Sequence, residues 1–249
     1  MLKRFFALLL ARPGLTAIIA GAASATGFAP LGLWPVTLVM LALLLWLLEH
    51  APGHRAAFAL GWLFGVGHFT IGNNWIATAF TFQAKMPAWL GWLAVPLLSL
   101  YLAIFIGLAT WAAWALWQRA ATPRQPGKAR EPAYLALLFA AAWIVTEWMR
   151  SWVFSGFAWN PLAAIWFSTS GQQLQGFGPA AEWVGTYGIS GLSILLPRLI
   201  LFLFGPKSPQ PATDSRFKAM LRDGDTYLLV LGVGSLLAIQ LFGAPSTRR

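Results

Sequence analysis

The sequence predicts an all-α fold, a polytopic transmembrane helical bundle of about seven spans. Of its 249 residues, 58% are hydrophobic and only 10% are charged, whereas a soluble domain carries about 25% charged residues. The apolar stretches run for roughly 17 to 30 residues without alternation, which suits spanning helices better than the ~10-residue strands of a β-barrel. We therefore expect residues 1–249 to form a single transmembrane domain.

The first two spans are expected over residues 15–28 and over a run that follows Trp34-Pro35 and ends at residue 48. The N-terminal segment has features of a signal peptide, including a cleavage-like Ala23-Ser24-Ala25. Arg12-Pro13 interrupts its apolar region, however. We interpret this segment as leading into an uncleaved first helix.

The third span, 56–80, contains small residues that predict close helix packing. Gly61 and Gly65 have the Gly-x-x-x-Gly spacing that lets two helix backbones approach each other. His68 lies inside the span, and a hydrogen-bonded packing histidine is favoured over a catalytic one. Two amides after Gly72 predict an unwound or interfacial turn.

Four further spans follow, separated by polar segments. The fourth exceeds a ~30 Å hydrocarbon core at about 1.5 Å per residue, so Pro96 is expected to kink it or its first turns to lie along the interface. The spans are 89–117, 133–152, 183–204 and 226–242. The intervening segments are 118–132, 153–182 and 205–225, of which 153–182 is expected to be a structured surface loop.

The basic residues set the expected orientation. Most of them fall in the N-terminal segment and in the 118–132 and 205–225 loops, so the positive-inside rule makes these segments cytoplasmic. The N-terminus is then cytoplasmic, and the 153–182 loop and the C-terminus share the outer face of a multi-pass protein. The net charge of +10 is explained by these basic cytoplasmic segments. No nucleic-acid partner is expected.

One charged pair stands out in the fifth span. Glu147 and Arg150 are three residues apart, so they can pair on one helix face. Two interpretations remain open, a structural ion pair in the bundle or a headgroup site in which Arg150 holds a phosphate. The tryptophans around them fit an aromatic belt at the membrane interface, and Trp75 and Trp159 fit it least well because they lie in turns. Whether the pair forms is not decided by the sequence.

The sequence lacks the residues that several kinds of chemistry require. Cysteine is absent, which excludes disulfides, thiolate metal sites and a cysteine nucleophile within the chain. No metal-ligand cluster, P-loop or Ser-His-Asp arrangement is recognisable, so no metal, cofactor or catalytic residue is expected. Glu182 and Lys85 share the outer side, but nothing in the sequence fixes their separation.

Four spaced motifs resemble the membrane part of the bacterial apolipoprotein N-acyltransferase family. They are Gly27-Phe28-Ala-Pro30-x-x-x-Trp34-Pro35, Gly72-x-x-Trp75, Thr146-Glu147-x-x-Arg150-x-Trp152-x-x-x-Gly156-Phe157-x-Trp159 and Gly185-x-Tyr187-Gly188-Ile-Ser190. The resemblance implies a bacterial inner membrane, so that the outer face with the 153–182 loop and the C-terminus is periplasmic. It also implies a phospholipid acyl donor, an apolipoprotein acceptor and a cysteine thioester on a nitrilase-like periplasmic domain. The sequence departs from the family pattern at Ala158, at Asn74 and in having neither the cysteine nor the nitrilase-like domain.

The sequence therefore leaves two possible functions open. The first is the membrane-embedded, truncated portion of an apolipoprotein N-acyltransferase, inactive alone, which binds donor lipid and docks a catalytic domain that is missing or separate. The alternative is a self-standing membrane lipid-binding or transport protein without catalytic activity. The residues expected to bind lipid or to dock the domain are Trp75, Glu147, Arg150, Trp152, Phe157, Trp159, Glu182 and Tyr187.

Overall fold

The computed structural model describes residues 2–82, 87, 89–120, 132–154, 156–167, 176–205, 232 and 234. These residues form helices and connecting turns without a strand, so the predicted all-α fold is confirmed. Lys85, nearly all of the seventh predicted span and most of the 118–132 and 205–225 loops lie outside the described residues.

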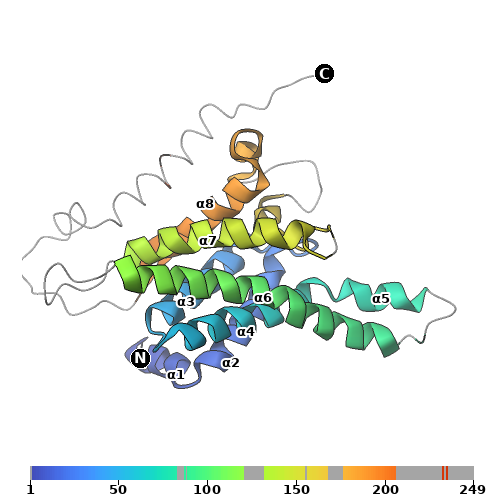
Figure 1. Cartoon of the computed structure of the whole chain (residues 1–249), viewed down its shortest axis with the longest axis horizontal. Helices are drawn as coiled ribbons and strands as arrows, with labels where there is room; N and C mark the ends of the chain where they lie inside the picture. The colour runs from blue at the N-terminus through green and yellow to red at the C-terminus, as the bar shows by residue number, and fades with distance from the viewer. Residues whose placement is uncertain are drawn as a thin grey trace, which may run out of the picture.

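Eight α-helices make up the described part of the chain (Figure 1). They are α1 (Leu2–Ala11), α2 (Pro13–Ser24), α3 (Trp34–Glu49), α4 (His54–Gly72), α5 (Trp75–Thr81), α6 (Trp89–Ala120), α7 (Pro132–Trp152) and α8 (Ala181–Phe204). Short 3-10 turns cover Ala25–Gly27, Leu162–Trp166 and Gly178–Ala180.

Three helices of the described part are long and apolar enough to cross a membrane. They are α6, α7 and the helical segment Gly178–Leu201. The 32 residues of α6 correspond to about 48 Å at 1.5 Å per residue, which is more than the ~30 Å hydrocarbon core. Helix α3 is apolar but shorter. A membrane protein is thus plausible on composition and structure together, and the count of seven spans and the orientation stay predictions.

Helix breaks occur where the sequence contains strong local signals. Pro13 begins α2 at the first helical position, where its missing N–H costs no hydrogen bond. The third predicted span is divided at Asn73 and Asn74 into α4 and α5, which confirms the turn expected after Gly72. Gly185 has φ 68° and ψ 176° and kinks α8 near its start.

Glycines place α4 against both of its main neighbours. A Cβ on Gly65 would lie 2.8 Å from Ala103 Cα, and one on Gly61 would lie 2.7 Å from Ile106 O, both on α6. On the other side of α4, a Cβ on Gly67 would lie 2.8 Å from Ala22 N of α2. The helix backbones therefore touch at these points, as the Gly-x-x-x-Gly spacing predicts.

Helix α4 packs between α2 and α6, α7 packs on α6 and α8 packs on α7, while α3 lies against α2 and α8. Figure 1 shows α6 and α7 side by side, with α5 and the first turns of α6 extending beyond the other helices. Tyr101 of α6 donates to Val153 O at 3.4 Å, so α6 and α7 run antiparallel and the end of α7 lies beside the N-terminal half of α6.

One expectation about the 153–182 segment does not hold for residues 162–166. The sequence predicted a surface loop, but Leu162, Ala163, Ile165 and Trp166 are each at most 2% exposed. Trp166 packs 5.1 Å from the Trp34 ring and 5.5 Å from the Phe177 ring, so it belongs to the core and not to an interfacial belt. Residues 162–166 are buried because their apolar side chains turn inward between α7 and α8, which periodicity in so short a stretch does not reveal. Phe154 and Phe157 are exposed, and residues 168–175 lie outside the described residues.

Candidate functional site

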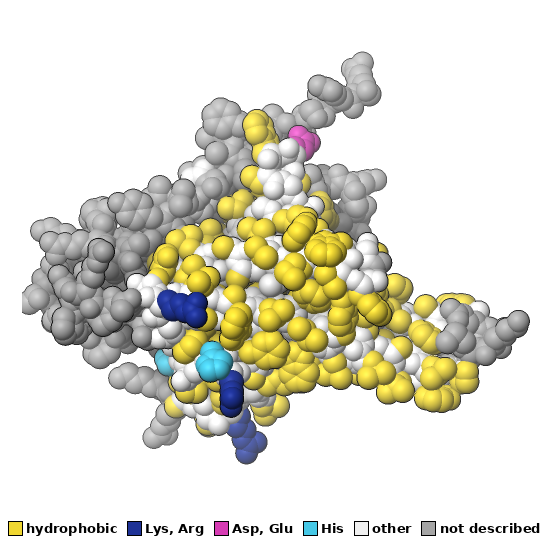
Figure 2. Space-filling view, in the orientation of Figure 1, with side chains coloured by type: hydrophobic (Ala, Val, Ile, Leu, Met, Phe, Trp, Pro, Cys, Tyr) yellow, Lys and Arg dark blue, Asp and Glu magenta, His cyan; other side chains and the backbone are white. Residues whose placement is uncertain are grey.

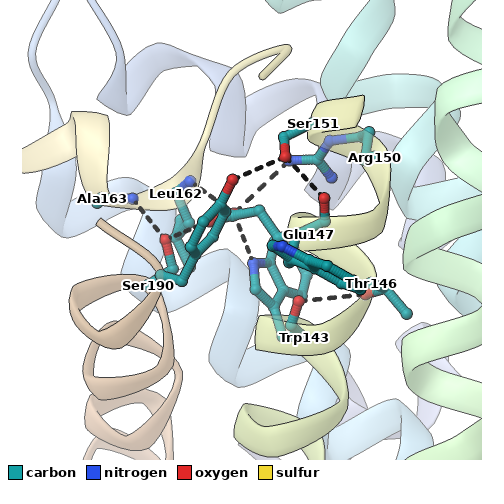
Figure 3. A network of polar contacts seen from close by, with 10 residues as sticks. Trp143, Thr146, Glu147, Arg150, Ser151, Leu162, Ala163 and Ser190 are labelled. Carbon is teal, nitrogen blue, oxygen red and sulfur yellow. Dashed lines mark hydrogen bonds and ion pairs between the residues drawn. The ribbon is translucent and has the colours of Figure 1, made fainter. Parts of the chain in front are cut away.

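The Glu147 carboxylate lies at the centre of a polar network near the end of α7 (Figure 3). Its Oε2 atom accepts hydrogen bonds from Trp143 Nε1 and from the backbone N–H of Leu162, each at 2.9 Å. Its Oε1 atom accepts from the Ser190 hydroxyl at 2.6 Å. The side chain is 1% exposed. A buried carboxylate is tolerated in such a site when donors of this kind satisfy its oxygens.

These contacts join three separate segments of the chain. Trp143 is on α7, Leu162 begins the 3-10 turn Leu162–Trp166, and Ser190 is on α8. Ser190 also accepts a 3.0 Å hydrogen bond from the backbone N–H of Ala163. A second link of the same kind runs from Trp166 Nε1 to Ser193 Oγ at 2.7 Å. The polar residues thus hold the segment after α7 against α8.

Arg150 is the second buried charge of this network. It is 2% exposed, and its Nη2 atom lies 3.6 Å from Glu147 Oε2. The Cζ atom lies 5.0 Å from the centre of the Phe69 ring, a cation–π contact with α4. The ion pair is therefore formed, although at a distance longer than a hydrogen bond, because donors at 2.9 Å already occupy Oε2.

Arg150 keeps donors that have no hydrogen-bond partner among the described residues. They are Nε and Nη2, and both are buried. Asn73 lies one helical turn after Phe69 and is 1% exposed. Its buried Nδ2 atom also has no hydrogen-bond partner within the described part of the chain. Unpartnered buried donors cost about 1–3 kcal/mol each. This end of the bundle therefore presents N–H groups that suit an oxygen acceptor.

The aromatic residues predicted for the site lie at the same end of α7, and several are half exposed. Trp152 is 55% exposed, and its ring centroid lies 5.4 Å from that of Trp148. Phe157 is 54% exposed and packs edge-on against Trp159 at 4.8 Å. The backbone between them is unusual, since Phe154, Trp159 and Asn160 all have positive φ. Strained backbone of this kind is common at functional sites.

The remaining predicted site residues are placed on two helices, α8 and α5. Tyr187 of α8 donates a 2.7 Å hydrogen bond to Ser151 of α7, so it joins the network from the other side. Glu182 is exposed in the first turn of α8, before the kink at Gly185. Trp75 begins α5 and is 55% exposed. The roles of all eight predicted residues in binding or docking stay predictions.

Sequence reasoning missed four members of the network. Trp143 and Ser193 were not singled out, and Ser190 appeared only as the last residue of the motif that begins at Gly185. The backbone N–H of Leu162 carries no side-chain signal at all. Only the serines, two small polar residues at i,i+3 in an apolar span, offered a hint that a buried acceptor faces them.

His68 has the packing role that the sequence favoured. Its Nδ1 atom lies 2.7 Å from Ser24 Oγ, which itself donates to Gly21 O at 2.6 Å. Ser24 has no exposed surface, and His68 is 5% exposed with its ring 5.2 Å from that of Phe28. The pair lies in the α2–α4 interface, so this serine is not accessible to a substrate.

Comparison with known proteins identifies relatives over most of the chain. Residues 20–197 match the family described as "Apolipoprotein N-acyltransferase N-terminal domain". A protein of Ralstonia nicotianae named "Apolipoprotein N-acyltransferase" is 36% identical over 184 residues, which cover 74% of this chain and 32% of the relative. Proteins of the same name from Allorhizobium ampelinum and Bordetella bronchiseptica are 35% and 34% identical, covering 74% and 88% of this chain and 34% and 39% of the relatives. The chain thus spans about a third of the length of the curated relatives it matches.

Proposed function

The chain belongs to the apolipoprotein N-acyltransferase family, and we propose that it forms the membrane-embedded portion of such an enzyme in a bacterial inner membrane. In this role it binds the phospholipid acyl donor, receives the apolipoprotein acceptor and docks a nitrilase-like catalytic domain. The observation that carries the proposal is the family match across the Glu147 network, which lies within residues 20–197.

The chemistry of acyl transfer has to be shared with residues outside this sequence. The chain contains no cysteine, and a thioester intermediate requires a thiolate nucleophile. Among the described residues, the buried hydroxyls of Ser24, Ser190 and Ser193 are engaged in contacts between segments, and that of Ser99 donates to Val95 O within α6. The proposed contribution of the chain is therefore to position lipid and partner domain, not to form the covalent intermediate.

Glu147 and Arg150 receive different proposed roles. Glu147 uses both oxygens for donors within the chain, so it acts as a positioning residue for the segment that carries Phe157 and Trp159. Arg150 retains Nε and Nη2 for an acceptor, and a phosphate oxygen of the donor headgroup is a strong acceptor for a guanidinium. For the headgroup to reach Arg150, the aromatic residues at this end of the bundle have to separate.

The exposed aromatic side chains form the proposed docking and lipid-contact surface. They are Trp75, Trp152 and Phe157. The partly buried Trp159, which packs against Phe157, and the residues Glu182 and Tyr187 complete the proposed set. Aromatic residues at the rim of a membrane protein can contact headgroups, and they are also enriched at protein interfaces.

The test is reconstitution with the remainder of a relative. The 249-residue chain is expressed alone, and as a fusion to the part of the Ralstonia relative that follows the matched region, in cells depleted of their own enzyme. Mass spectrometry of a lipoprotein N-terminus measures N-acylation. We expect the fusion to restore N-acylation and the chain alone not to.

Two variants of the fusion sharpen this test. Arg150→Ala is expected to weaken binding of the donor phospholipid, whereas Arg12→Ala, which removes an exposed arginine outside the predicted site, is the matched control. N-acylation by the chain alone would refute the shared chemistry. Unchanged donor binding in Arg150→Ala would refute the headgroup role. A fusion that folds but never acylates would favour the alternative, a self-standing lipid-binding or transport protein.

A further inference from the structure

An open surface cavity of about 310 Å³ lies between the start of α4 and the second half of α6. Its lining residues are His54, Arg55, Phe58, Leu108 and Trp111. The cavity is separate from the Glu147 network. That network lies near the end of α7, which contacts α6 at Tyr101. Residues 108–111, which line the cavity, are two to three turns further along α6.

The walls of the cavity combine two kinds of chemistry. Phe58 packs directly on the α6 backbone, since a Cβ on Gly107 would lie 2.8 Å from Phe58 Cε2. Leu108 is partly exposed and Trp111 is 43% exposed, so the α6 wall is apolar and aromatic. His54 and Arg55 are exposed in the first turn of α4 and supply the polar edge. The site is therefore basic at one side and apolar at the other.

Exposed basic residues gather at this end of the bundle. Arg12 immediately precedes α2, Arg55 begins α4 and Arg119 ends α6, and all three are exposed. These helix ends meet, because α4 packs parallel to α2 and antiparallel to α6, as the order of their glycine contacts shows. In Figure 2 the basic side chains lie at one end of a broad apolar face.

We propose that this cavity binds an anionic phospholipid from the adjacent membrane leaflet. The phosphate contacts Arg55 and His54, and the glycerol and first methylene groups contact Phe58, Leu108 and Trp111. A guanidinium binds phosphate oxygens in a bidentate manner, and basic pockets between transmembrane helices are suited to anionic headgroups. The apolar wall selects a lipid over a soluble phosphate, because a free phosphate gains nothing from Leu108 and Trp111.

The absence of cysteine makes a direct test possible, because one introduced cysteine can be labelled uniquely. Ile104→Cys lies one turn from Leu108 on α6, is 40% exposed in the wild type and does not line the cavity. Leu137→Cys on α7, 42% exposed, is the matched lipid-facing control. Each variant of the full chain is labelled with bimane and reconstituted in phosphatidylcholine vesicles. Quenching is measured with phosphatidylglycerol or phosphatidylcholine that carries a nitroxide on its acyl chain.

We expect nitroxide phosphatidylglycerol to quench the Ile104 label at about three- to fivefold lower mole fraction than nitroxide phosphatidylcholine, and the Leu137 label equally with both lipids. Arg55→Gln should remove the preference at Ile104, and Arg119→Gln, which removes the same charge outside the cavity, should retain it. Excess inorganic phosphate should leave the preference unchanged.

Four results would overturn the proposal. They are equal quenching of the Ile104 label by both lipids, equal loss in Arg55→Gln and Arg119→Gln, displacement by inorganic phosphate, and a label that no lipid quenches because another protein chain covers it. The proposal does not depend on acyl transfer, so the reconstitution experiment and this one can fail independently.

Discussion

Ser190 Oγ lies 2.6 Å from Glu147 Oε1, and this contact joins α8 to α7 across 43 positions of the chain. The same hydroxyl accepts from the backbone of Ala163, so one serine bridges a helix, a carboxylate and the intervening segment. The stability of this end of the bundle is therefore expected to depend on a few polar atoms.

Replacing Glu147 by alanine should destabilise the protein strongly. The change leaves the N–H groups of Trp143 and Leu162 and the Ser190 hydroxyl without their acceptor, and it leaves Arg150 as an uncompensated buried charge. Breaking a buried pair in this way costs about 3–5 kcal/mol. The free energy of unfolding is measured by SDS titration in mixed micelles, followed by far-UV circular dichroism. Glu182→Ala removes an exposed carboxylate and should change the free energy of unfolding by less than about 0.5 kcal/mol. Equal effects of the two substitutions would contradict the proposal that Glu147 stabilises this end of the bundle.

Ser190→Ala should cost about 1–2 kcal/mol, because the backbone N–H of Ala163 loses its acceptor and Glu147 loses one donor. The effect should shrink by at least about 0.5 kcal/mol in the Glu147→Ala background, since the two residues share one network. The same SDS titration of both single variants and the double variant measures this coupling. Strict additivity would show that Ser190 acts only through Ala163.

Gly65→Ala should destabilise the α4–α6 contact by about 1–3 kcal/mol. The new methyl group would lie 2.8 Å from Ala103 Cα, and a backbone atom cannot rotate away. Gly53→Ala is the matched change, because its Cβ meets nothing within 4 Å and its φ of −178° suits any residue. We expect Gly53→Ala to be neutral or slightly stabilising. Similar unfolding free energies for the two variants would rule out backbone contact at Gly65.

Gly185→Ala should either cost about 1–3 kcal/mol or straighten the start of α8, because φ 68° with ψ 176° is a region that only glycine occupies readily. Spin labels on Glu182→Cys and Trp152→Cys report which outcome occurs through the distance between them. A variant with wild-type stability and an unchanged distance would contradict the kink.

Features with a local cause were predictable from the sequence. The packing glycines Gly61 and Gly65, the turn after Gly72 and the break at Arg12-Pro13 all follow from steric properties of the residues themselves. His68 as a packing histidine followed from its apolar surroundings. The motif Glu147-x-x-Arg150 was also recognisable, because i,i+3 spacing places the two charges on one helix face.

Features set by long-range contacts were not predictable. Nothing near Glu147 in the sequence indicates that Leu162 and Ser190 will donate to it, and those donors are the reason the Arg150 pair is as long as 3.6 Å. The burial of Trp166 was missed for a similar reason, since its partners Trp34 and Phe177 come from distant parts of the chain.

The glycine contacts of α4 also limit how this bundle can move. With Gly61 and Gly65 against one helix backbone and Gly67 against another, α4 cannot rotate about its axis or slide by a fraction of a turn without steric overlap on one side. The three helices α2, α4 and α6 thus behave as one rigid body. Any opening that admits a lipid has to use hinges elsewhere. Candidates are the turn at Asn73-Asn74, where α4 ends, and the positive-φ residues Phe154, Gly156, Trp159 and Asn160, which follow α7.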